Sequence, residues 1–411
     1  MKKILFILYT CCILLFPVSA QQIPSFKAND RIVFLGNSIT EGGHYHSYIW
    51  LYYMTHFPEL PLRIYNGGIG GDCASHMVFR FDSDIKIKKP TYLVCSFGMN
   101  DSGYDGYNKP GYDKYANKQV EYANTEFGKL QQQILADKKI KNVVLLGSSP
   151  YDENVKLEGV ETLHGKNETI KRIIEMQAEV AQKRGWGFVN FNTVMCELNK
   201  EIQQSDSTAT FCGGDRIHPD KDGHMVMAYL FLKAQGLAGK EVAYFHINAT
   251  NRKAMEERNC RITHIKNEND TISFSYLSRS LPFPVDTIPR WGTKGTARDA
   301  VRQVPFMQEM NQEIMKVTDL HGNFRVTIDG TEIGRWDGNE LSKGINLAEI
   351  TCTPQYQQSL SIMYLNEERC AIEKRLRQYM AMQYVFFKHR GLLFADNKAA
   401  LDAAKAERES H

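Results

Sequence analysis

Short apolar segments alternate with longer amphipathic ones along the first 240 residues. The short segments are flanked by Gly, Pro and Asn, which predicts buried strands; they cover residues 31–35, 62–65, 92–97, 142–147 and 187–191. Apolar residues at three- and four-residue spacing predict helices between them, over residues 46–56, 117–137, 167–184 and 221–235. Strands that alternate with helices indicate a parallel sheet covered on both faces, so we predict a three-layer α/β/α domain over residues 21–240.

The pattern changes after about residue 239. Strand-like stretches follow at residues 243–248, 261–265, 271–276 and 324–328, and the turn signal Asp329-Gly330 ends the last of them. We therefore predict a smaller β-rich unit over residues 241–355. Helix-forming residues return from residue 357 to 404, which predicts a helical C-terminal segment over residues 356–411 with a frayed end.

The N-terminus has the features of a secretory signal peptide. Lys2 and Lys3 precede an apolar run from Ile4 to Phe16, and the small residues Ser19 and Ala20 provide a cleavage site. The run is shorter than the about 20 helical residues that span a bilayer. We therefore expect residues 1–20 to be removed on export to a periplasm or beyond the cell, with no stable membrane anchor.

Composition and charge narrow the class of protein. The chain has 411 residues, 43% of them hydrophobic and 24% charged, which is typical of a globular protein. Lys and Arg total 50 against 47 acidic residues, so no broad basic face for nucleic acid is indicated. Of nine Cys residues two lie in the predicted leader, and the other seven show no metal-binding spacing. An odd number excludes complete internal pairing and leaves one or two disulfide bridges open.

Ser38 stands where the first predicted strand gives way to a helix, in the segment Gly36-Asn37-Ser38-Ile39-Thr40-Glu41. Such a serine is exposed at the carboxyl edge of a parallel sheet, where ligands of open α/β folds bind. The alternative is that Ser38 caps the helix, with Glu41 three residues later completing a capping box.

Two further segments supply groups that ester hydrolysis needs at the same edge. The segment from Tyr65 to Asp72 is rich in glycine, and a Gly71 amide aimed at a reacting carbonyl would stabilise an oxyanion. Asn100 follows the most apolar strand, and its side-chain amide is a second donor. The alternatives are a plain glycine turn, and an Asn that adopts a left-handed turn conformation.

The fourth segment, Asp215-Arg216-Ile217-His218-Pro219, precedes the last predicted helix of the domain. An Asp three residues before a His can hold one ring nitrogen while the other removes a serine proton. The alternative for His218 is a surface histidine bonded to its neighbours.

In this order the four segments resemble the SGNH hydrolases, also called the GDSL family, over about residues 30–235. The resemblance implies a flavodoxin-like α/β/α fold and two-step acyl transfer without a metal or organic cofactor. It implies that Ser38 is the nucleophile, that His218 is the general base and that Asp215 orients His218. The backbone amides of Ser38 and Gly71 and the side chain of Asn100 are then the oxyanion donors.

Asn37 departs from the family pattern, which usually has Asp just before the nucleophile. Asn keeps an acceptor oxygen for the turn but loses the charge. Because this Asp is not the triad carboxylate, we expect the change to adjust the local field without abolishing activity.

Residue types near the site and the predicted export indicate the substrate. Tyr104 and Tyr107 follow Asn100 among hydrogen-bonding groups, a combination that suits a sugar ring, and Asn37 and Asp72 are further candidate substrate contacts. The alternative is that these aromatic rings pack helices onto the sheet. We expect an exported acetylesterase that removes O-acetyl groups from a polysaccharide or oligosaccharide and contributes to polysaccharide degradation.

Two other functions stay open. One is a lipase or lysophospholipase, and the other is a non-catalytic glycan-binding protein on a hydrolase fold. Apart from an acetylated glycan, the sequence indicates no partner, and nothing in it indicates an oligomeric state.

Overall fold

The predicted catalytic domain, which is the α/β/α domain of residues 21–240, is built on a parallel five-stranded sheet. The computed structural model describes residues 23–269, 271–289, 292–382 and 406, so the predicted signal peptide and the last part of the predicted C-terminal helix lie outside the described residues. The strand order is β2-β1-β3-β4-β5, with all pairs parallel, which is the flavodoxin-like order. The strands are β1 (Arg31–Gly36), β2 (Arg63–Gly68), β3 (Tyr92–Phe97), β4 (Asn142–Gly147) and β5 (Gly187–Asn190). The predicted fold class is confirmed.

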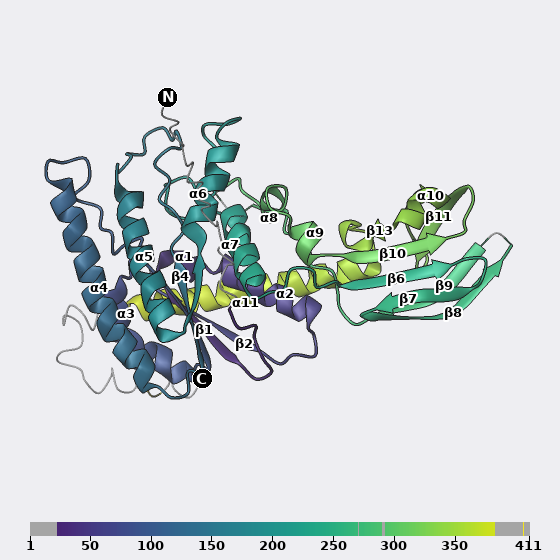
Figure 1. The fold of residues 1–411 in the computed structure, drawn as a ribbon, viewed down its shortest axis with the longest axis horizontal. Helices are drawn as coiled ribbons and strands as arrows, with labels where there is room; N and C mark the ends of the chain where they lie inside the picture. Colours follow the sequence, from purple (N-terminus) through teal and green to yellow (C-terminus); the bar gives the residue numbers. More distant parts are fainter. Residues whose placement is uncertain (1–22, 270, 290–291, 383–405, 407–411) are drawn as a thin grey trace, which may run out of the picture.

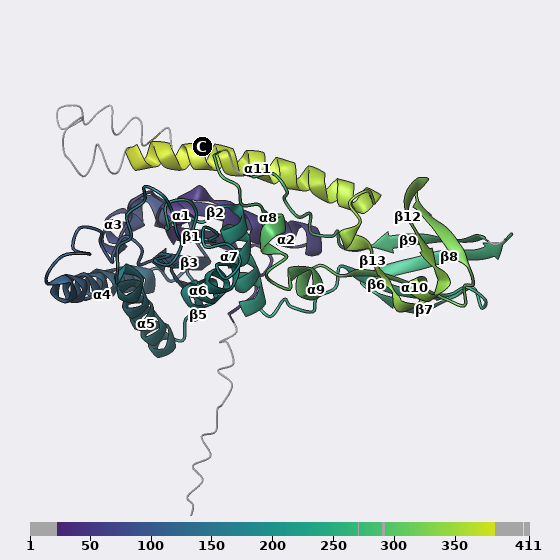
Figure 2. The same cartoon turned by 90° about the horizontal axis from the view of Figure 1, so that it is seen from above.

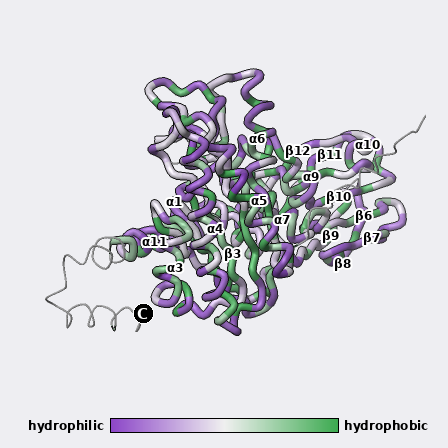
Figure 3. Tube along the Cα trace, turned by 60° about the vertical axis from the view of Figure 1, so that its left-hand side comes forward, coloured by the Kyte–Doolittle hydropathy of each residue, from purple (hydrophilic) through white to green (hydrophobic). Residues whose placement is uncertain are grey.

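Helices cover both faces of this sheet because successive side chains of each strand point to opposite sides. In β1, Ile32 and Phe34 belong to one core and Val33 and Leu35 to the other. The first core includes residues of α2 (His44–His56), α6 (Phe191–Ile202) and α7 (Lys221–Ala234). The second core includes residues of α3 (Ala74–Arg80), the π-helix η1 (Phe81–Ile85) and α4 (Tyr112–Ala136). The helix α5 (Lys166–Arg184) contributes residues to both cores. Hydrophobic residues gather accordingly around β3 (Figure 3).

A β-rich unit lies at the far end of the elongated molecule from α4 (Figure 1). Its main sheet has the order β13-β10-β6-β7, and the hairpins β8-β9 and β11-β12 pack against it. The strands are β6 (Ala243–Asn248), β7 (Lys253–Arg258), β8 (Cys260–Glu268), β9 (Thr271–Ser278), β10 (Glu313–Thr318), β11 (Asn323–Ile328), β12 (Thr331–Asp337) and β13 (Ile345–Asn346), with α10 (Gly338–Lys343) and the 3₁₀ turn η3 (Leu347–Glu349) among them.

The chain between β9 and β10 returns to the catalytic domain. It contains α8 (Ala297–Ala300) and α9 (Phe306–Met310), and Phe283, Phe306 and Met310 are buried in the same core as α2 and α7. The Lys221 ammonium also donates to Asp286 Oδ2 at 2.6 Å. The predicted unit over residues 241–355 therefore includes a stretch that packs with the catalytic domain, a long-range contact that the local pattern does not reveal.

The C-terminal helix α11 (Pro354–Ala381) runs along one side of the catalytic domain (Figure 2). Thr353 caps its first turn by accepting from the Tyr356 amide, and Pro354 occupies the first helical position. Among the described residues, no helix combines the length and apolarity needed to cross a membrane. The seven cysteines that remain after the predicted leader are all free.

Candidate active site

Ser38 is the first residue of a short helix, α1 (Ser38–Gly42), directly after β1. The helix cap is Asn37, whose Oδ1 accepts from the Ile39 amide at 3.0 Å. Glu41 does not complete a capping box, because its carboxylate accepts from the Gly70 amide in the glycine-rich loop. The alternative that Ser38 acts as the cap is therefore wrong, and its hydroxyl is available for other contacts.

Gly68 explains how closely this turn approaches the neighbouring strand. A Cβ at Gly68 would lie 2.1 Å from the Glu41 nitrogen, so the backbones of β2 and α1 can meet only where a side chain is absent. The close approach brings the loop after β2 beside Ser38.

A hydrogen-bonded chain joins Ser38, His218 and Asp215. The Ser38 hydroxyl lies 2.7 Å from His218 Nε2, and His218 Nδ1 lies 2.6 Å from Asp215 Oδ2. An ionised Asp215 fixes the proton on Nδ1, so Nε2 is the free acceptor for the serine proton. Burial would raise the pKa of Asp215, but hydrogen bonds from the His218 ring and from the His218 and Ile217 amides hold that pKa below its usual value.

The loop that carries His218 is anchored by Arg216. This residue is 3% exposed and has a left-handed backbone with φ of 69°. Its guanidinium donates to the carbonyls of Asp152 and Val155 at 3.1 and 2.5 Å, and its own carbonyl accepts from the Asp152 amide. Arg216 thus ties the Asp215–His218 loop to the chain after β4 and keeps His218 directed at Ser38.

Asn100 is held in one amide orientation at the edge of the site. Its Nδ2 donates to the Asp72 carbonyl at 3.0 Å, and its Oδ1 accepts from the Tyr104 hydroxyl at 2.8 Å. A carboxamide has two N–H groups, so one remains for a ligand. The neighbouring Gly71 has φ of 79° and is exposed, with nothing within 4 Å of where a Cβ would lie. Both predicted oxyanion donors therefore lie at the same loop contact, where Gly71 is exposed and Asn100 is half-buried.

Lys166 supports the turn that carries Asn100, a role that no local sequence pattern indicates. Its ammonium is buried and donates to Met99 O, Ser102 Oγ and Gly103 O at 2.6 to 2.8 Å. The Tyr104 ring covers the nitrogen at 3.8 Å. Burial lowers the pKa of Lys166 to about 7.

Three of the four predicted substrate contacts are inside the protein. Tyr107 is 2% exposed and its hydroxyl donates to Ser102 O; Asp72 is 2% exposed and pairs with Arg80; Asn37 is 3% exposed and caps α1. Residues so deeply buried offer almost no surface to a substrate. The prediction that these three residues contact the substrate directly is therefore corrected: they support the site from inside the protein. Tyr104 alone of the four is only half-buried.

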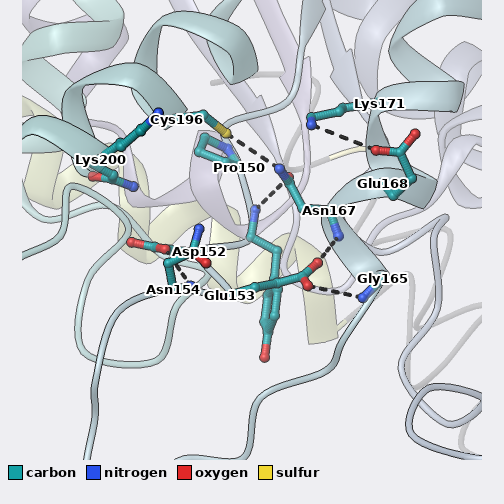
Figure 4. Close-up of a pocket in the computed structure, with 12 residues that line it drawn as sticks. Pro150, Asp152, Glu153, Asn154, Gly165, Asn167, Glu168, Lys171, Cys196 and Lys200 are labelled. Carbon is teal, nitrogen blue, oxygen red and sulfur yellow. Dashed lines mark hydrogen bonds and ion pairs between the residues drawn. The ribbon is translucent and has the colours of Figure 1, made fainter. Parts of the chain in front are cut away.

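A polar pocket separate from Ser38 and His218 is drawn in Figure 4. It includes Asp152, whose carbonyl accepts from Arg216. It has a volume of about 230 Å³ and is lined by the chain after β4 and by residues of α5 and α6. Its carboxylates are engaged, since Glu153 accepts from the Gly165 and Asn167 amides and Glu168 pairs with Lys171. None of Ser38, Asp215 or His218 lines it, so it is not the acyl-transfer site. Within the described part of the chain, no group of three or more His, Cys, Asp or Glu could hold a metal ion.

An α/β/α fold with a serine, a histidine and a carboxylate hydrogen-bonded in series is typical of serine-type hydrolases. Comparison with known proteins specifies the family. Residues 34–226 match the GDSL-like lipase/acylhydrolase family, and residues 360–411 match the C-terminal helical domain of diltiazem deacetylase. The chain belongs to the GDSL-like lipase/acylhydrolase family and is an esterase of the SGNH type.

Two known proteins illustrate the range of relatives. A solved gut microbial diltiazem-metabolizing enzyme is 50% identical, with a TM-score of 0.90 over 93% of this chain and 87% of that chain. An acetylxylan esterase of Geobacillus stearothermophilus is 22% identical over 224 residues, covering 51% of this chain and 95% of that protein. Its solved structure gives a TM-score of 0.40.

Proposed function

We propose that the protein is a serine acetylesterase with Ser38 as nucleophile, His218 as general base and then acid, and Asp215 as the residue that orients His218. The observation that carries this assignment is the continuous hydrogen-bonded chain from the Ser38 hydroxyl through His218 to Asp215. Proton transfer needs donor and acceptor about 2.6 to 3.2 Å apart, and both links fall in that range.

The reaction proceeds in two steps. His218 Nε2 takes the Ser38 proton as Oγ forms a bond to the acetyl carbonyl carbon, and the resulting imidazolium then protonates the departing alcohol oxygen. A water next attacks the acetyl-serine with His218 again as base, and the proton returns to Ser38 as acetate leaves. Asp215 stays ionised throughout and stabilises the imidazolium.

The oxyanion formed in each step is assigned to three donors: the Ser38 amide, the Gly71 amide and the free N–H of Asn100. The Tyr104 hydroxyl and the Asp72 carbonyl hold the Asn100 side chain before any substrate arrives. Donors that are already oriented stabilise developing charge without reorganising at the moment of reaction.

The acetyl group and a glycan alcohol are the finer part of the proposal. The two matched relatives are named as an acetylxylan esterase and a diltiazem-metabolizing enzyme, and the matched C-terminal domain is named for a diltiazem deacetylase, which supports acetyl as the acyl group. Export through residues 1–20 would bring the enzyme to acetylated polysaccharides. The half-buried Tyr104 ring beside Asn100 provides an aromatic face for a sugar.

A second candidate substrate is diltiazem itself. The observation that favours it is the 50% identity to the diltiazem-metabolizing enzyme over nearly the whole chain, including the helical C-terminus. Diltiazem and an acetylated sugar share an acetyl ester on a ring, so one triad can serve both.

Initial rates on five substrates test this proposal: acetylated xylan, acetylated pectin, diltiazem, and matched aryl acetate and aryl octanoate esters. The protein used is residues 21–411, and acetate or product release is measured. We expect the aryl acetate to be cleaved faster than the octanoate, and one of the glycans to be cleaved with the higher kcat/KM relative to diltiazem. Faster octanoate cleavage would favour a lipase, and cleavage of diltiazem with no release from either glycan would overturn the glycan assignment.

A further inference from the structure

The C-terminal helix α11 supplies hydrogen bonds that a neighbouring strand would otherwise provide. β2 is an edge strand of the sheet, and an edge leaves backbone N–H and C=O groups without a strand partner. Here Glu373 Oε1 accepts from the Asn66 amide at 2.7 Å, and Arg377 Nε donates to the Gly68 carbonyl at 3.0 Å. Figure 2 shows α11 passing alongside α1 and β2. Side chains of α11 therefore hold the end of the strand that leads into the Gly70–Asp72 loop.

Arg377 also forms a buried bidentate salt bridge with Asp84. Its Nη1 and Nη2 lie 2.8 and 2.7 Å from Oδ1 and Oδ2 of Asp84, and the two residues are 3% and 0% exposed. Burial alone would raise the pKa of Asp84, but Arg377, Lys88 and Arg80 hold it well below its usual value. Asp84 is thus a carboxylate that needs its cationic partners, because a buried charge without them is strongly unfavourable.

Arg80 continues this network to the site. Its Nη1 donates to Asp84 Oδ2 at 2.5 Å, and its Nε donates to Asp72 Oδ2 at 2.6 Å. Its Nη2 donates to the carbonyls of Gly36 and Gly67, at the ends of the strands that precede Ser38 and Gly71. The Asp72 carbonyl in turn accepts from Asn100 Nδ2. A continuous series of buried contacts therefore runs from Arg377 to the nucleophile turn and to both loops of the oxyanion site.

We propose that Arg377 is a positioning residue for ester hydrolysis, and that α11 contributes to the active site through this residue. The inference rests on the proposed function of Ser38, Gly71 and Asn100. Removing the Arg377 guanidinium takes one cationic partner from Asp84, which also pairs with Arg80. It also removes the hydrogen-bond donor of the Gly68 carbonyl. The Gly70–Asp72 loop then shifts, and the oxyanion donors lose alignment with the transition state more than with the bound ester.

The test compares Arg377→Gln and Arg377→Lys with the wild type and with Arg375→Gln. Arg375 is an exposed residue of the same helix that belongs to no part of this network, so it is the matched control. Labelling with a fluorophosphonate, run to completion, counts the functional serines in each preparation. The steady-state kcat on an aryl acetate is then expressed per labelled site, which removes any loss due to unfolded protein.

We expect Arg377→Gln to lower kcat per site about tenfold to a hundredfold with KM within twofold, since an oxyanion donor is worth about 10²- to 10³-fold and here would be displaced rather than removed. Arg377→Lys should recover part of the loss, and Arg375→Gln should stay within twofold of the wild type. If Arg377→Gln fails to fold, Arg377→Lys carries the test, with a threefold or greater loss of kcat per site expected.

An unchanged kcat per labelled site, or a loss confined to KM, would overturn the positioning role while leaving the proposed function intact. A wild type that is neither labelled nor active on the ester would instead overturn the proposed function itself. The two failures are therefore distinguishable in one set of measurements.

Discussion

The Oγ atom of Ser38 and the Nε2 atom of His218 lie 2.7 Å apart although 180 residues separate them in the chain. Ser38 begins the helix after β1, whereas His218 lies in the loop before α7, on the other side of the switch in strand order. The carboxyl ends of parallel strands meet at one edge of a sheet, and this topology brings the two residues together. Each group of the site can be tested by substitution.

Replacing Asp215 with Asn should lower kcat about 10⁴-fold with little change in KM. The Asn amide would donate to His218 Nδ1, so that the remaining ring proton moves to Nε2 and the base no longer accepts from Ser38. Steady-state kinetics on an aryl acetate measure the loss. The matched control is Asp206→Asn, because Asp206 is an exposed loop carboxylate whose Oδ1 accepts from the Thr208 amide. The kcat of this control should stay within twofold of the wild type. A loss of less than tenfold at Asp215 would show that another group orients His218.

Replacing Asn100 with Ala should lower kcat about 10²- to 10³-fold, because one oxyanion donor disappears. Tyr104→Phe keeps that donor and removes only the hydroxyl that fixes its orientation, so a loss of about fivefold is expected, corresponding to about 1 kcal/mol. The kcat of both variants is measured on the same aryl acetate. The free energy of unfolding of each variant serves as the control. Equal losses in the two variants would contradict the assignment of Asn100 as the donor.

Lys166 gives a pH-dependent prediction. Burial lowers its pKa to about 7 in the folded protein, against 10.5 for the ordinary side chain. Between these values the unfolded chain binds more protons than the folded one, so this group makes stability rise with pH from about 7 to 10.5, by at most about 1.4 kcal/mol per pH unit.

Urea unfolding of the wild type and of Lys166→Met at pH 6 and pH 9 measures this effect. Met removes the titration and, at every pH, the three hydrogen bonds that the Lys166 ammonium donates. The wild type should therefore gain free energy of unfolding relative to Lys166→Met as the pH rises. A difference that is flat or falls between the two pH values would show that Lys166 stays fully protonated in the folded state.

Much of the catalytic domain followed from local pattern. The five buried strands are short apolar runs bounded by turn residues, and each lies within a few residues of its predicted place. The sites of Ser38, Asn100 and His218 are strand ends or loops with distinctive residues nearby. In contrast, α3 and α6 were not predicted, because α3 is short and continues into a π-helix and α6 begins directly where β5 ends.

The contacts that position the site could not be predicted in the same way. Arg80, Lys166 and Arg377 are charged residues on helices, and such residues usually face solvent. Their burial depends on carboxylates and carbonyls brought close by the folded chain, as in the pair between Arg377 and Asp84, which lie 293 residues apart. The strands β7 and β12 were missed because exposed charged residues interrupt their apolar positions. In β10 the charged residues are Glu313, which is buried and accepts from the Tyr276 hydroxyl, and the half-buried Lys316.

The proposed function depends above all on Ser38 being the acylated nucleophile of an acetylesterase. The most direct test is acetate release from an aryl acetate by residues 21–411, compared with the Ser38→Ala variant after both are shown to unfold at the same urea concentration. We expect the wild type to hydrolyse the ester and to carry an acetyl group on Ser38 after acid quench, and the variant to release acetate at the background rate. Release by Ser38→Ala within tenfold of the wild type, or an acetyl group trapped on another residue, would contradict this role of Ser38.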